Sequence, residues 1–153
     1  MQARLNANQI APDAYKALLG LQAYVNASGI EKPLLELVKV RASQINGCAF
    51  CIAMHTADAM KDGESHERLH LLNAWRETAL YTARERAALT WTEALTLIAE
   101  DHVPDATYDE VHEHFSDKEL VDLSFAVAAI NAWNRLAIAF RTPPQLVKTS
   151  QAA

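Results

Sequence analysis

The only two cysteines of the 153-residue chain lie close together, in the block Cys48-Ala49-Phe50-Cys51. Two thiols with two residues between them can close a disulfide, because one helical turn brings their sulfur atoms into bonding range. His55 follows Cys51 by four residues, so on a helix its imidazole lies one turn away and can take a proton from the thiol. These residue types indicate a dithiol redox centre with its own base.

Glu36 stands twelve positions before the first cysteine, in a separate helical segment. A turn at Asn46-Gly47 would fold that segment back alongside the cysteines. A buried carboxylate there would hold the imidazole in one tautomer and raise its basicity. The alternative is a solvated glutamate that pairs with Lys32 at i−4 and Lys39 at i+3 on an exposed helix face.

Helix start and stop signals predict an all-α protein of six or seven helices. No segment shows the alternation of a strand, so we expect one domain over residues 1–153, with a core at about 15–142 and a fraying tail at 143–153. The expected helices run from Pro12 to near Gly29, from Pro33 to Gly47, from about Cys48 to Gly63, from Ser65 to roughly Glu77, from Thr82 to about Asp101, from Thr107 over a short stretch, and from Ser116 to Phe140.

The segment Leu120–Phe140 is apolar on most sides of a helical projection, which predicts a central buried helix. Its polar exceptions Ser124, Asn131 and Arg135 fall on one narrow strip. They would line a site or an oligomer interface, or they are buried polar groups with hydrogen-bond partners. We favour the last interpretation, since buried polar groups are usually paired for structural reasons.

Composition excludes several classes of partner. The net charge is −5 and the basic residues are scattered, which argues against binding to nucleic acid or to an anionic membrane. The apolar segment 120–140 carries polar and charged residues that disfavour a membrane span. The N-terminal residues lack the apolar core of a signal peptide, so we expect a cytoplasmic protein. In the cytoplasm, a pair of nearby cysteines is more often catalytic or metal-binding than structural.

The spacing of the four residues resembles one known family. Glu36, eleven residues, Cys48, two residues, Cys51, three residues and His55 match the AhpD-like alkylhydroperoxidases of the carboxymuconolactone decarboxylase superfamily. The flanking segments 43–48, 74–78 and 81–86 are also similar, and the resemblance covers roughly residues 15–142.

The resemblance implies a helical homo-oligomer, a trimer or hexamer, that reduces hydroperoxides in antioxidant defence without a cofactor or metal. Cys51 would attack the peroxide, Cys48 would resolve the sulfenic acid as a disulfide, and His55 and Glu36 would carry the proton through a water. A dithiol donor, lipoyl or thioredoxin-like, would restore the thiols. One departure is Phe50, which stands where the founding type has a second histidine; this shortens the relay and suggests an apolar entrance.

Four other interpretations stay open. The protein is a general disulfide oxidoreductase, or its two cysteines are inert buried thiols. A third possibility is a zinc or structural module, in which His66, His70, His102, His112 or His114 would supply the zinc ligand that Cys48, Cys51 and His55 leave open. Structural zinc, however, usually shows a second spaced ligand pair. The last alternative is a carboxymuconolactone decarboxylase-like lyase, and the cysteine pair counts against it.

Overall fold

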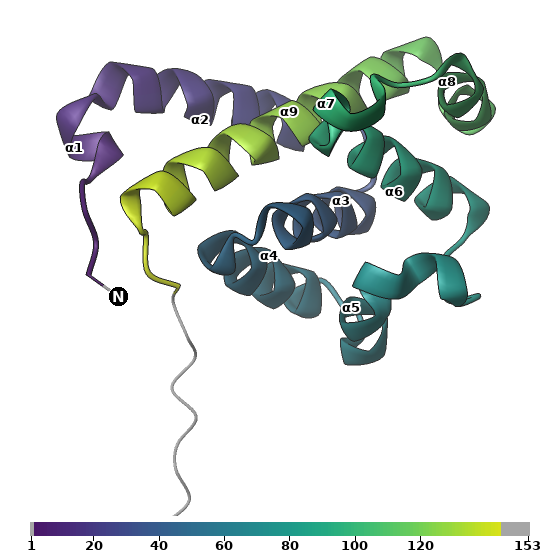
Figure 1. Ribbon diagram of the computed structural model, residues 1–153, viewed down its shortest axis with the longest axis horizontal. Coiled ribbons are helices and arrows are strands. Elements are labelled where there is room, and N and C mark those ends of the chain that lie inside the picture. Colours follow the sequence, from purple (N-terminus) through teal and green to yellow (C-terminus); the bar gives the residue numbers. More distant parts are fainter. Residues whose placement is uncertain (1, 145–153) are drawn as a thin grey trace, which may run out of the picture.

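The computed structural model describes residues 2–144, which contain nine α-helices, one 3-10 helix and no β-strand (Figure 1). The predicted all-α, single-domain architecture is confirmed. The elements are α1 (Ala7–Ile10), α2 (Pro12–Asn26), α3 (Lys32–Asn46), α4 (Ala49–Lys61), α5 (His66–Leu71), η1 (Leu72–Glu77), α6 (Ala83–Thr96), α7 (Ile98–Asp101), α8 (Asp105–His112) and α9 (Asp117–Phe140).

The predicted helix caps are largely found. Ser65 accepts a hydrogen bond from the third residue of α5, and Thr82 and Ser116 form full capping boxes at the starts of α6 and α9. The expected cap at Thr107 is wrong. The helix α8 already begins at Asp105, because the fixed φ of Pro104 (−58°) suits a helix entry and the Asp105 carboxylate favours the first turn.

Two predicted helices are each divided, and one helix was not predicted. The helix expected from Thr82 to Asp101 breaks at Leu97, whose φ of −101° and ψ of 28° leave the helical range, and it resumes as α7. The segment after Ser65 turns from α5 into η1, which contains the non-helical residue Ala74. Neither break carries a glycine or proline, so no local signal announces it. The unpredicted α1 is a single turn capped by Asn6.

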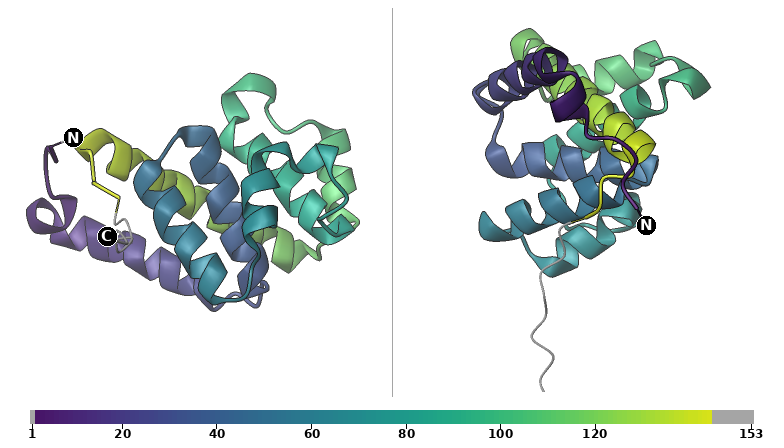
Figure 2. Two further views of the ribbon diagram at one scale, coloured as in Figure 1. Left: turned by 90° about the horizontal axis from the view of Figure 1, so that it is seen from below. Right: turned by 90° about the vertical axis from the view of Figure 1, so that its left-hand side faces the viewer.

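The long helix α9 is the central element. It packs against α2, α3 and α6, and it crosses above the antiparallel pair α3 and α4 (Figures 1 and 2). By length and composition α9 is also apolar enough to cross a membrane, a test that core helices of soluble proteins pass as well. Its inner face, which includes the fully buried Leu123, forms the protein core.

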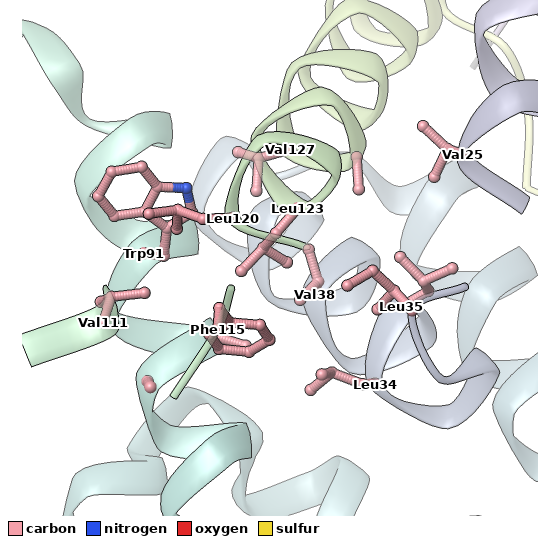
Figure 3. Packing of buried hydrophobic residues seen from close by; sticks show 14 of the residues in the cluster. Val25, Leu34, Leu35, Val38, Trp91, Val111, Phe115, Leu120, Leu123 and Val127 are labelled. Atoms are coloured by element: carbon pink, nitrogen blue, oxygen red, sulfur yellow. The ribbon is translucent and has the colours of Figure 1, made fainter. Parts of the chain in front are cut away.

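Figure 3 shows the main hydrophobic core, where the side chains of α2, α3, α6, α8 and α9 meet around Val38, Leu123 and Phe115. Each large aliphatic side chain buried here stabilises the fold by about 1.5–3 kcal/mol. A second cluster joins α3, α4, α5, η1 and α6 around Leu37 and Trp75. The helix α3 therefore lies between both clusters, which fixes the position of the polar side chains that it carries.

All three polar residues of the α9 strip have hydrogen-bond partners, as the favoured interpretation expects, but only Asn131 is buried, whereas Ser124 is half-buried and Arg135 is exposed. Ser124 accepts from the indole N–H of Trp91 at 2.9 Å. Asn131 donates to Thr96 Oγ1 at 3.0 Å, and Arg135 donates to Asn131 Oδ1 at 2.9 Å. The strip thus ties α9 to α6. The predicted tail at 143–153 falls almost wholly outside the described residues.

Candidate functional site

The start of α4 is set by Gly47. Its φ of 70° is left-handed, a conformation that glycine adopts without strain, and it ends α3 with the Cys48 N–H bonded to the Ser43 carbonyl at 3.0 Å. Cys48 becomes the N-cap of α4, and its sulfur accepts a hydrogen bond from the Cys51 N–H at 3.4 Å. The sequence prediction that Cys48 lies at a helix start is confirmed.

The two sulfur atoms lie 2.8 Å apart in the dithiol form. Both cysteines are only 1% exposed and pack with Ala42, Ile130 and Ala137 between α3, α4 and α9. A disulfide bond is about 2.03–2.05 Å long. The pair can therefore close with a small shift of the side chains and no movement of the helices.

The two thiols differ in acidity. The hydrogen bond from the Cys51 thiol brings the pKa of Cys48 down to about 7 against the opposing effect of burial, assisted by the Cys51 and Phe50 backbone N–H groups and the Asn134 amide. The hydrogen bond with Cys48 also raises the pKa of Cys51 far above its ordinary value, together with burial and the charge on Cys48. The pair therefore loses one proton near neutral pH and shares the other between its sulfurs.

Glu36 reaches the imidazole from α3. His55 Nδ1 lies 2.8 Å from Glu36 Oε2, and the residues are 8% and 5% exposed. Beside an ionised carboxylate, Nδ1 keeps the proton and donates a hydrogen bond to Glu36, which leaves Nε2 as an acceptor. The expected contact between helices is present, and the solvated alternative for Glu36 is excluded by its burial.

A buried lysine completes this polar chain. Lys39 Nζ donates to Glu36 Oε1 at 2.8 Å, and the two side chains are 7% and 6% exposed. Lys32, the other expected partner, instead pairs with Asp62 at 2.9 Å on the surface. Burial acts to raise the pKa of Glu36, but the hydrogen bonds from His55 and Lys39 outweigh it and hold that pKa below its ordinary value. Glu36 is therefore ionised.

Cys51 and the hydrogen-bonded chain Lys39–Glu36–His55 border the same cavity. It has a volume of about 1060 Å³ and lies between the N-terminal segment, α2, α3, α4 and the C-terminal end of α9. Cys51, His55, Glu36 and Lys39 all border it, whereas Cys48 does not. Its wall is largely apolar and aromatic, with side chains from Phe50, Met54, Trp133, Leu136 and Phe140. Cys51 is therefore the sulfur that a molecule in the cavity meets first.

Two residues of the site, Lys39 and Asn134, were not predicted. Lys39 is three residues from Glu36, so spacing indicated the pair but not its burial. Asn134 lies between Ile130 and Ala137 on the face of α9 that packs against the cysteines. Its amide donates to Ser43 Oγ at 3.0 Å and accepts from Asn46 at 2.9 Å. The sequence would have identified Asn134 only if it were known which face of α9 packs against the cysteine block.

The remaining histidines lie away from this site. His66, His70, His102 and His112 are exposed and His114 is half-buried. Across residues 2–144, no three His, Cys, Asp or Glu side chains gather in a set that would hold a metal ion.

Comparison with known proteins places this geometry in context. Residues 12–94 match the carboxymuconolactone decarboxylase family. The uncharacterized protein YdfG of Bacillus subtilis is 44% identical over 139 residues, which cover 91% of this chain and 95% of YdfG.

Solved structures share the fold. A protein of unknown function from Agrobacterium tumefaciens, described as a candidate antioxidant defence protein AhpD, matches with a TM-score of 0.93 at 43% identity, over 95% of this chain and 100% of that one. A peroxidase-related protein from Ralstonia eutropha, described as an alkylhydroperoxidase AhpD core, matches with a TM-score of 0.80 at 21% identity, over 91% and 74% of the two chains. The second match shows the fold alone.

Proposed function

Since this chain belongs to the carboxymuconolactone decarboxylase family and has an AhpD-like fold, we propose that it is a thiol-dependent hydroperoxide reductase that cycles Cys48 and Cys51 between dithiol and disulfide. The observation that carries the proposal is the sulfur pair at 2.8 Å, with Cys51 bordering the same cavity as the His55–Glu36 pair. Its role would be antioxidant defence in the cytoplasm.

The first step is the attack of Cys51 on the peroxide. The proton of Cys51 passes to Cys48 or to Nε2 of His55, and the resulting thiolate displaces an alkoxide from the O–O bond. Cys51 becomes a sulfenic acid, and the alkoxide takes up the proton and leaves as an alcohol. Glu36 stabilises the imidazolium whenever His55 holds the proton, because its charge lies 2.8 Å from Nδ1.

The second step closes the disulfide. The Cys48 thiolate attacks the sulfur of the Cys51 sulfenic acid, forms the S–S bond and breaks the S–O bond, and the hydroxide that leaves takes up the proton that Cys48 gave up on ionising and becomes water. In sum, two thiols and one hydroperoxide give one disulfide, one alcohol and one water. In the resting dithiol Cys48 is the more acidic thiol, with a pKa of about 7, and the Asn134 amide and the Phe50 backbone N–H, which help to lower that pKa, do not depend on the Cys51 thiol that is consumed in the first step. An external dithiol donor, lipoyl or thioredoxin-like, would return the electrons.

Two alternatives are separated by their chemistry. A general disulfide oxidoreductase would oxidise the same pair with a small disulfide and leave peroxide unconsumed. A lyase of the decarboxylase type would act without thiol oxidation. The assembly would be a homo-oligomer, a trimer or hexamer, as the family resemblance implies.

The test is peroxide consumption with reduced lipoamide or thioredoxin as the electron donor, measured for the wild type and for Cys51→Ser. We expect the variant to lose turnover entirely. Ala49→Ser is the matched control, because it adds a hydroxyl to the same helical turn at an exposed position, and it should keep the wild-type rate. Equal turnover in the wild type and Cys51→Ser would remove the peroxidase proposal.

A further inference from the structure

Lys39 is an unusual residue to find at this site. Its side chain is 7% exposed, and lysine is seldom buried unless a partner compensates for its lost hydration. The carboxylate of Glu36 needs a hydrogen-bond donor for Oε1. An uncharged side chain would supply one with a smaller desolvation penalty than the ammonium group of a lysine. The chain instead places a full positive charge between α3 and the cavity.

The buried charged and titratable groups that border the cavity together with Cys51 form one linked set. Glu36 lies at the centre, with His55 on one oxygen and Lys39 on the other, each at 2.8 Å. Glu36 and Lys39 cancel, so the site is neutral before a thiol ionises. Without Lys39, the thiolate would form beside an uncompensated buried carboxylate, and like charges disfavour each other strongly at low dielectric.

The other charged groups that face the cavity are screened or paired. Lys32 pairs with Asp62 and Lys61 pairs with Asp58, and both lysine side chains are more than two-thirds exposed. Arg4, on the N-terminal segment, donates to the Ala139 carbonyl of α9. These groups border the cavity at its rim, where water weakens their fields. Lys39 is thus the buried cation that can offset Glu36.

We propose that Lys39 is a positioning residue that neutralises Glu36 and thereby makes it easier for Cys51 to lose its proton. The inference rests on the proposed function, because it gives Lys39 a part in preparing the same thiols. Lys39 touches neither sulfur in this account and acts through the carboxylate that it shares with His55.

The experiment measures the ionisation of Cys51 directly, through the ultraviolet absorbance of its thiolate as a function of pH. A Cys48→Ser background leaves Cys51 as the sole thiol. Lys39→Met and Lys39→Gln remove the charge, Lys39→Arg keeps it, and Lys32→Met removes an exposed lysine from the same helix. We expect both neutral variants to move the titration midpoint upward by about one pH unit or more, with the arginine variant and the Lys32 control close to the parent.

A midpoint unchanged in folded neutral variants would overturn the proposal. So would a midpoint shifted equally by Lys32→Met, or unfolding of both neutral variants while Lys39→Arg folds, because Lys39 would then act on stability alone. This readout contains no peroxide. Failure of the peroxidase proposal would appear separately, as a normal thiolate titration in a protein that consumes no hydroperoxide.

Discussion

Replacing Glu36 by Gln removes the central charge of the Lys39–Glu36–His55 chain and should destabilise the protein. The glutamine keeps a carbonyl acceptor but leaves the buried Lys39 without a counter-charge. Breaking a buried ion pair on one side typically costs about 3–5 kcal/mol. Because both side chains of the pair are less than 8% exposed, solvent screens them little. We expect the free energy of unfolding to fall by about 3 kcal/mol.

The double variant Glu36→Gln/Lys39→Met isolates the pair from other effects of each substitution. With the lysine gone, no unpaired charge remains buried, so the second substitution should recover part of the stability lost in the first. We expect a coupling free energy of about 0.5–3 kcal/mol between the two positions, the range measured for residues in direct contact. The double variant should therefore be at least as stable as Glu36→Gln alone.

Urea unfolding of the reduced proteins at matched concentration provides the measurement. The pKa of Glu36 is lowered in the folded state, so its contribution is fully present above its unfolded value near 4.5 and is lost as pH falls through the folded value. The difference between wild type and Glu36→Gln should thus be constant near neutral pH and shrink in acid. Additive effects of the two substitutions, or a difference that persists unchanged at low pH, would refute the reasoning.

Three further predictions concern the thiols and their neighbours. Cys48→Ser should still react once with hydroperoxide and accumulate a sulfenic acid at Cys51 that dimedone traps; absence of the adduct would mean that Cys51 is not the attacking residue. His55→Ala should slow the attack and move the rising limb of the pH–rate profile upward, because the base is lost, and stopped-flow oxidation at several pH values checks this against an unchanged profile. Asn134→Leu keeps the branched arrangement of side-chain heavy atoms but removes the amide beside Cys48, so the pKa of Cys48 should rise above about 7 and stability should drop by about 1–3 kcal/mol for the unpaired buried partners; an alkylation profile that stays in place would contradict the role of the amide.

Local signals in the sequence sufficed for most of the fold and for the core of the site. Gly47 marks a helix end, so Cys48 had to begin the next helix, and the four-residue spacing placed His55 on the same helix as Cys51. The contact between Glu36 and His55 joins two helices, and it was expected from the turn at Gly47 together with the family spacing. The helix punctuation was equally local, as the capping boxes of α6 and α9 show.

The rest depends on packing between distant segments. Spacing on a helix pairs Glu36 equally with Lys32 and Lys39, and only the packing of distant segments buries Lys39 and brings Asp62, at the end of α4, to Lys32. Asn134 reaches the cysteines because α9 crosses them, a relation that no local pattern encodes. The break at Leu97 likewise follows no glycine or proline. At Leu97 tertiary contacts override helix propensity. At Lys39 and Asn134 they decide which partners the side chains meet.

Titrating the reduced protein with one equivalent of an organic hydroperoxide, followed by thiol counting and intact mass, tests the redox cycle most directly. We expect both thiols to disappear together, the protein to become lighter by two hydrogens, and a dithiol to restore the starting mass. Oxygen added stably to a single cysteine, or two thiols that survive the peroxide, would contradict this cycle.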